Sequence, residues 1–171
     1  ITRHRYPSGA EVGALYRVDR ETGMRAARTM SRLHAADLRP LGITADCLPV
    51  LDVPVEGAHD VIGDRAYGHD PNTVATLGRE AAEGLLEGGV LPVIKHIPGH
   101  GRAGVDSHKG LPRVTTSLED LEQTDFAPFR ALADRYLPKG PGAVFTFGLK
   151  PGATSARTAG KQFIDGLQLF S

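Results

Sequence analysis

Two short apolar runs constrain the fold of this chain more than any other feature. ITADCLPVLDV (43–53) and VLPVIKH (90–96) are rich in β-branched residues and shorter than a typical buried helix. A run that is apolar throughout is typical of a strand covered on both faces of a parallel sheet. Each run is followed by a loop and then by a helical pattern. The sequence therefore predicts an α/β fold with parallel strands.

The helical segments carry recognisable start signals. Asp19 is a plausible N-cap, Pro71 occupies the favoured first position of a helix, and Thr116 or Ser117 precedes an acidic first turn. In the first helix, Leu33 and His34 are expected to share the buried side with Met24, Ala27, Met30, Ala35 and Leu38. The predicted elements are helices over 19–38, 71–88 and 117–134 and strands over 43–51, 90–95 and 143–148, with residues 1–16 irregular.

Both long loops follow a strand, so both are expected at the carboxyl end of the sheet. In a β/α barrel this end carries the active site. The order of elements fits an open doubly wound sheet equally well.

Composition excludes several classes of function. Twenty basic and twenty acidic residues cancel, which argues against nucleic acid or an anionic membrane as a partner. No apolar run approaches the roughly 20 residues that span a bilayer. Cys47 is the single cysteine, so the chain can form no internal disulfide, as is usual in a reducing compartment. We expect a cytoplasmic protein and, because the first residue is Ile1, a fragment.

The loop KHIPGHGRAGVDSHKGLP (95–112) concentrates polar chemistry after the second strand. In one interpretation Lys95 extends its apolar stem to reach solvent or pairs with a neighbouring carboxylate. In the other, Lys95 and His96 donate hydrogen bonds to hydroxyls of a polar ligand. The carboxylate of Asp106 lies two residues from His108, where it can fix the tautomer of the imidazole and leave its other nitrogen to exchange a proton. This pair is the strongest catalytic candidate from the residues alone.

Three other interpretations of this loop fit less well. Its glycines match neither phosphate-binding motif, and no helix follows them directly. His96, His100 and His108 are candidate metal ligands, but no accompanying ligand pattern supports a zinc site. Ser107 is not in the GxSxG context of a serine hydrolase.

The stretch 95–112 resembles the signature of family 3 glycoside hydrolases, specifically the β-N-acetylhexosaminidases of peptidoglycan recycling. LGITADCLPVLDV, VIGDRAYGHDP and TDFAPFRALAD are similar to further segments of that family, so the resemblance covers about 1–134. It implies a partial (β/α)8 barrel that, in the complete enzyme, removes terminal non-reducing β-linked N-acetylglucosamine from muropeptides with retention.

The resemblance also implies roles for individual residues. Asp106 and His108 would form the acid/base dyad, with His108 protonating the leaving oxygen. Arg65, Lys95 and His96 would bind sugar hydroxyls. No metal or cofactor is implied.

The family's nucleophile is an aspartate in a segment resembling MSDD, and residues 1–171 contain no such segment. Asp46 and Asp52 lie in or at the end of a predicted strand and are interpreted as structural. We therefore expect a barrel fragment that is inactive by itself. The alternatives are a non-catalytic truncated or chimeric α/β domain that binds sugar weakly at most, and a metal-dependent hydrolase that uses the histidines.

The tail departs from the family after Asp134. GPGAVFTFGLK and GKQFIDGLQLFS, within 138–171, resemble the carboxy-terminal domain of O-acetylhomoserine sulfhydrylases, from a part without the lysine that holds pyridoxal phosphate. The predicted division is thus a partial barrel over 1–134 and a tail of different or diverged origin over 135–171. A diverged barrel strand and helix would give the same pattern.

Overall fold

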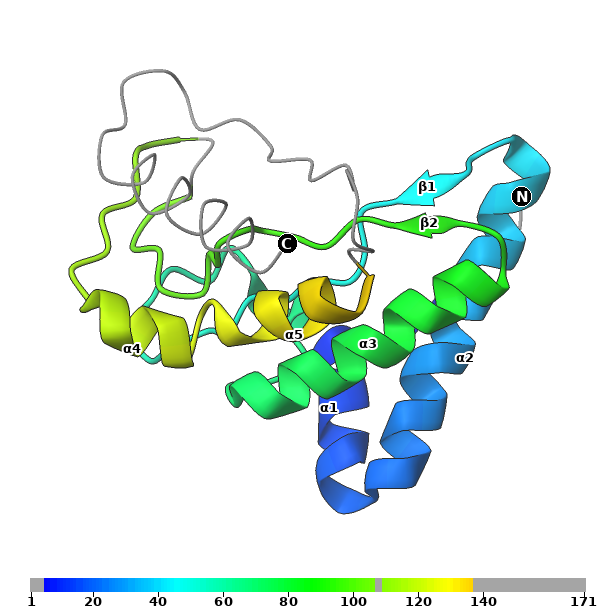
Figure 1. Ribbon diagram of the computed structural model, residues 1–171, viewed down its shortest axis with the longest axis horizontal. Coiled ribbons are helices and arrows are strands. Elements are labelled where there is room, and N and C mark those ends of the chain that lie inside the picture. The colour runs from blue at the N-terminus through cyan, green and yellow to red at the C-terminus, as the bar shows by residue number, and fades with distance from the viewer. Residues whose placement is uncertain (1–4, 107–108, 137–171) are drawn as a thin grey trace.

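The computed structural model describes residues 5–106 and 109–136 of the chain. Figure 1 shows the helices α2, α3 and α5 on one side of two adjacent strands. The elements in chain order are α1 (Gly9–Val18), α2 (Arg20–Leu38), η1 (Arg39–Leu41), β1 (Ala45–Asp46), η2 (Gly63–Arg65), α3 (Pro71–Glu87), β2 (Leu91–Pro92), α4 (Leu118–Gln123) and α5 (Ala127–Tyr136).

The two predicted strands pair in parallel, as expected. Ala45 lies opposite Leu91, and a separate parallel bridge joins Val50 to Lys95. Regular pairing is shorter than the predicted 43–51 and 90–95, and Pro49, which has no N–H to donate, lies in the gap between the paired regions. Between the two paired regions, the first segment contains one residue more than the second. This extra residue forms a β-bulge. The predicted strand at 143–148 lies outside the described residues.

Helices α2 and α3 form where their caps and apolar patterns predict. Asp19 caps α2 by accepting from the N–H groups of Glu21 and Thr22, and Asp70 caps α3 ahead of Pro71. The predicted buried face of α2 is wrong at Leu33, which is 49% exposed. The helix instead meets its neighbour through small residues, which let two backbones approach closely. Its buried positions are Gly23, Ala27, Ser31 and Ala35.

The irregular start predicted for residues 1–16 is wrong from Gly9 onward, where α1 begins. Ser8 accepts a hydrogen bond from the Glu11 N–H, and the Glu11 carboxylate accepts from the Ser8 N–H. This reciprocal pair satisfies two N–H groups at the helix start. A side chain at Gly13 would collide with the carbonyl of Tyr67, so α1 lies directly against the loop that follows β1.

The helix predicted over 117–134 is two helices. Ser117 caps α4 as expected, but the helical pattern breaks at Thr124, Asp125 and Phe126 before α5 begins. Asp125 is 3% exposed and bonded to Arg102 in the glycine-rich loop, a contact that a continuous helical pattern does not reveal.

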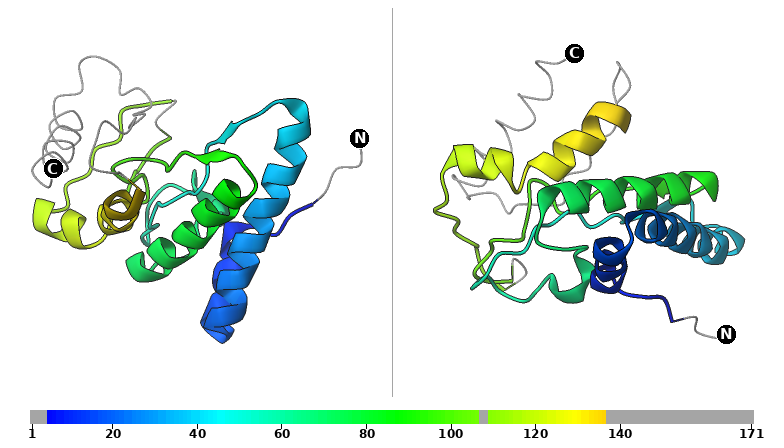
Figure 2. Two further views of the ribbon diagram at one scale, coloured as in Figure 1. Left: turned by 45° about the vertical axis from the view of Figure 1, so that its right-hand side comes forward. Right: turned by 90° about the horizontal axis from the view of Figure 1, so that it is seen from below.

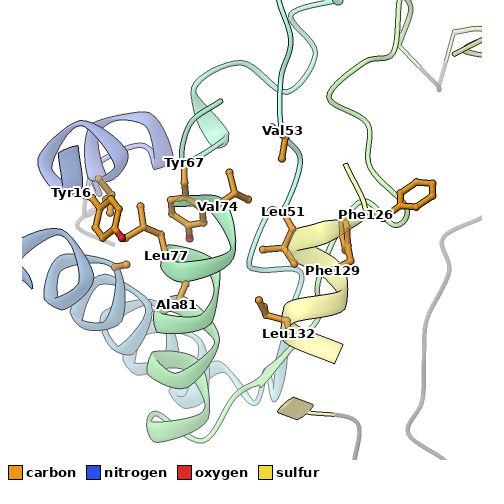
Figure 3. Close-up of a cluster of buried hydrophobic side chains, with 12 residues drawn as sticks. Tyr16, Leu51, Val53, Tyr67, Val74, Leu77, Ala81, Phe126, Phe129 and Leu132 are labelled. Carbon is orange, nitrogen blue, oxygen red and sulfur yellow. The ribbon is translucent and has the colours of Figure 1, made fainter. Parts of the chain in front are cut away.

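The core lies between the first strand segment and the helices. Leu51 is fully buried, and Figure 3 shows it between α3 and α5, facing Phe129 and Leu132. The two further views in Figure 2 show α3 between α2 and α5. Burying one leucine of this kind contributes about 2 kcal/mol. Packing of Leu51 on the helices sends the next residue, Asp52, toward the opposite face, because successive side chains alternate.

Over residues 5–106 and 109–136, no helix is long and apolar enough to cross a membrane.

Candidate active site at the carboxyl ends of the strands

Backbone pairing brings the two strand ends together. The Leu51 N–H donates to the Lys95 carbonyl at 2.7 Å, and the Lys95 N–H donates to the Pro49 carbonyl at 3.1 Å. The residues that follow on each chain segment, Asp52 and His96, are therefore neighbours. This is the edge of a parallel sheet at which active sites are built.

Asp52 is the centre of the contacts at this edge. Its carboxylate is 0% exposed and is hydrogen-bonded to His96 Nδ1 at 2.5 Å; it also accepts from the His100 backbone N–H at 2.7 Å and from the His96 backbone N–H at 3.4 Å. A buried charge of this kind is tolerated when donors surround it. Sequence reasoning assigned Asp52 a structural role and missed its bond to His96. The available signal was a carboxylate at the carboxyl end of a buried strand.

Two glycines shape the loop after His96. Gly99 has φ +131°, a conformation that side chains rarely adopt, and a Cβ there would lie 3.1 Å from Asp125 Cβ. A Cβ at Gly101 would lie 2.0 Å from the Val53 carbonyl oxygen. The loop therefore packs closely against the end of the first strand segment. Gly104, by contrast, has nothing within 4 Å of the position a Cβ would take.

A buried ion pair anchors the same loop to the start of α5. Arg102 Nε donates to Asp125 Oδ2 at 2.6 Å, and Arg102 Nη2 donates to Thr124 Oγ1 at 3.0 Å. The Thr124 hydroxyl also donates to Asp125 Oδ2 at 2.7 Å. Charge-assisted bonds of this length are among the stronger hydrogen bonds in proteins.

Arg65 ends the short turn η2, in the loop after β1. Its guanidinium donates to the carbonyls of Val61 and Ile62, at 2.5 and 3.1 Å, within its own turn. The turn packs on the strand through a cluster of Val50, Ile62 and Ala66, and Val50 is the residue that bridges to Lys95. The chain segments that carry Arg65 and Lys95, both predicted to bind sugar, therefore both contact Val50.

The predicted dyad is described only in part. The Asp106 carbonyl accepts from the N–H groups of Lys109 and Gly110, which forms a turn. His108 lies outside the described residues. The Nδ1 atom of His100 is buried and has no hydrogen-bond partner among the described residues. In this part of the chain, no three His, Cys, Asp or Glu side chains are grouped to hold a metal ion.

A cavity of about 660 Å³ lies beside this edge, between α1 and the loop 54–70. Arg17, His59 and His69 contribute to its polar lining, and Gly101 reaches its rim, whereas Lys95 and His96 are not among the described residues that line it. Tyr67 also lines it, and complete burial raises the pKa of its phenol far above the ordinary value. The cavity therefore lies beside the strand ends but is not lined by Arg65, Lys95 or His96.

The chain matches the family described as the glycosyl hydrolase family 3 N terminal domain over residues 5–139. It is 43% identical over 134 residues to the beta-hexosaminidase LpqI of Mycobacterium tuberculosis. The match covers 77% of this chain and 33% of that protein. It is also 36% identical over 156 residues to a beta-hexosaminidase of Chromobacterium violaceum. This match covers 91% of this chain and 42% of that protein.

Solved structures agree with these sequence matches. The structure of NagZ from Neisseria gonorrhoeae in complex with N-trifluoroacetyl-D-glucosamine has a TM-score of 0.72 and 37% identity, covering 76% of this chain and 38% of that one. This likeness confirms the predicted fold class, a partial (β/α)8 barrel-type fold with parallel strands. The chain spans about a third to two fifths of the length of these relatives.

Proposed function

The chain belongs to glycosyl hydrolase family 3, and on that premise we propose that it carries the sugar-binding strand ends and the acid/base loop of a β-N-acetylhexosaminidase. The whole protein would act in the cytoplasm on muropeptides, releasing terminal β-linked N-acetylglucosamine with retention. The observation that carries this proposal is the meeting of Asp52, Lys95 and His96 at the carboxyl end of two parallel segments. The ligand in the NagZ complex, N-trifluoroacetyl-D-glucosamine, is an N-acylated glucosamine like the sugar proposed here.

In this proposal, His108 protonates the departing glycosidic oxygen, and Asp106 orients its ring. General acid catalysis of this kind typically contributes about a hundred- to ten-thousand-fold in rate. Retention requires a carboxylate nucleophile that forms a covalent glycosyl intermediate. Residues 1–171 contain no segment resembling that of the family's nucleophile, so we expect the 171-residue chain by itself to bind sugar weakly without turnover.

Sugar binding tests the strand-end residues directly. Titration of the labelled chain with N-acetylglucosamine should shift the amide resonances around Lys95 and His96, with a dissociation constant of about a millimolar or weaker. Lys95→Ala should abolish the shifts. Lys109→Ala removes the same charge from an exposed position in the same loop and should leave them unchanged. Equal effects of the two variants would contradict the binding site.

Turnover tests the missing nucleophile. A chromogenic aryl N-acetylglucosaminide has a good leaving group and is the most forgiving substrate, and we expect no hydrolysis of it above background. Hydrolysis that disappears in His108→Ala would show that the chain supplies a nucleophile after all. Hydrolysis that persists in that variant would also remove His108 from the mechanism.

A further inference from the structure

The buried carboxylate of Asp52 determines where the proton of His96 lies. The Asp52 side chain is 0% exposed, whereas the His96 side chain, which is bonded to it through Nδ1, is 36% exposed. Oδ2 receives His96 Nδ1, and Oδ1 receives the backbone N–H groups of His96 and His100. An ionised carboxylate only accepts hydrogen bonds, so an ionised Asp52 requires the proton of this bond to be on Nδ1.

We propose that Asp52 is a positioning residue that holds neutral His96 in the Nδ1–H tautomer, with an unprotonated Nε2 available to a ligand. A neutral imidazole has one donor and one acceptor nitrogen, and the bond made by one nitrogen sets the role of the other. Neutral His96 therefore accepts a hydrogen bond at Nε2. The proposal differs here from the sequence-based expectation, in which His96 donates to a ligand hydroxyl.

The tautomer restricts the class of ligand. A hydroxyl group can donate to Nε2, so a sugar satisfies it, whereas a fully ionised phosphate or carboxylate has no proton to offer. The bond from His100 to the same carboxylate fixes the start of the glycine-rich loop relative to the ring. One carboxylate thus orients both the ring and the loop. The sugar as ligand rests on the function proposed above, but the tautomer does not.

Long-range proton–nitrogen correlation spectra of the nitrogen-15-labelled chain test the proposal without any ligand. At about pH 8, where histidine is ordinarily neutral, His96 should show the Nδ1–H pattern, assigned by its loss in His96→Gln. In Asp52→Asn, the side-chain amide can donate to Nδ1, so the pattern should change to Nε2–H. Asp46→Asn, in β1 of the same segment, should leave it unchanged.

An Nε2–H pattern in the unsubstituted chain overturns the proposal, because it means that Asp52 donates to the ring. An unchanged pattern in folded Asp52→Asn also overturns it. If Asp52→Asn does not fold, the pattern of the unsubstituted chain decides alone.

Adding N-acetylglucosamine to the same sample separates this proposal from the function. The Nε2 resonance should shift on binding, because a sugar hydroxyl donates to Nε2 in this proposal. The Nδ1–H pattern without any sugar-induced change supports the role of Asp52 and contradicts the sugar-binding function.

Discussion

The residue that breaks the predicted third helix, Asp125, also anchors the candidate site. Its side chain is 4% exposed and that of its partner Arg102 is 21% exposed, so the pair is largely withdrawn from water. Removing one member of a buried pair leaves the other charge without compensation, which is more costly than losing an exposed pair. Arg130 and Glu122 form such an exposed pair nearby, with side chains 42% and 45% exposed.

We therefore predict that Asp125→Ala lowers the free energy of unfolding by about 3 kcal/mol. Glu122→Ala is the matched control and should change it by less than about 0.5 kcal/mol. Urea unfolding followed by circular dichroism measures both. Similar losses for the two variants would show that the Arg102–Asp125 pair does not hold the loop.

His34 should make stability depend on pH. Burial lowers its pKa below the ordinary value, and the nearby Asp46 and Asp37 only partly oppose this. Its ring packs edge-on against Tyr6 at a centroid distance of 4.3 Å. Because the folded-state pKa is depressed, the folded protein favours the neutral ring. The stabilisation is fully present above the unfolded-state pKa and is lost as the pH falls through the folded-state value.

We predict that the free energy of unfolding falls between about pH 7.5 and about pH 5, and that His34→Gln makes this fall shallower. Urea unfolding at several pH values gives the slope for each protein. His59→Gln removes an exposed histidine and separates the effect of the half-buried His34 ring from the loss of any histidine. A His34→Gln slope as steep as that of the unsubstituted chain would refute the prediction.

At the scale of elements, close approach holds α2 and α3 together. A Cβ at Gly84 would lie 2.2 Å from the Arg28 carbonyl oxygen and 3.0 Å from Ser31 Cβ. The ion pairs between these helices join Arg28 to Glu80 and Glu87, and Arg32 to Glu87. They are partly exposed and contribute little. The contact between the helix backbones therefore accounts for more of the stability.

Gly84→Ala should be destabilising even though alanine favours helix by about 1 kcal/mol. The added methyl group forces the helices apart, and we expect a net loss of about 2 kcal/mol in the free energy of unfolding. Gly104→Ala, at an open position in the loop, should have little effect. A Gly84→Ala variant as stable as the unsubstituted chain would mean that the helices can separate without cost.

At the scale of the whole molecule, large apolar side chains are exposed at the two-stranded region. Leu91 is 55% exposed in β2, and Ile43 is 41% exposed just before β1. Among the described residues, each strand has a partner on one side only. Unpaired strands with apolar side chains tend to pair with other chains.

We expect this protein to associate as its concentration rises, which sedimentation velocity measures. Leu91→Lys should shift the population toward the monomer, because a charge opposes edge pairing. Val18→Lys places the same charge at an 87% exposed position at the end of α1 and should not. A monomer at every concentration would contradict the prediction, as would equal effects of the two lysines.

The sequence alone determined α2, α3, the parallel pairing and the position of the candidate site after the strands. These follow from local signals: the caps Asp19 and Asp70, the repeat of apolar residues, and loops too long for simple connections. Lys95 and His96 were predicted as site residues for the same reason, because they end an apolar strand. The origin of the tail 135–171 and the role of His108 stay predictions, since 137–171 and His108 lie outside the described residues.

Tertiary structure decided what local pattern does not contain. Helix α1 lies where Gly13 permits contact with Tyr67, and the break before α5 lies where Asp125 meets Arg102. The Asp–His pair visible in the sequence, Asp106 and His108, is two residues apart, whereas the pair observed in the structure, Asp52 and His96, is 44 residues apart. Parallel pairing of Val50 with Lys95 creates that second pair. A contact between distant residues depends on strand register and packing, which no local stretch of sequence specifies.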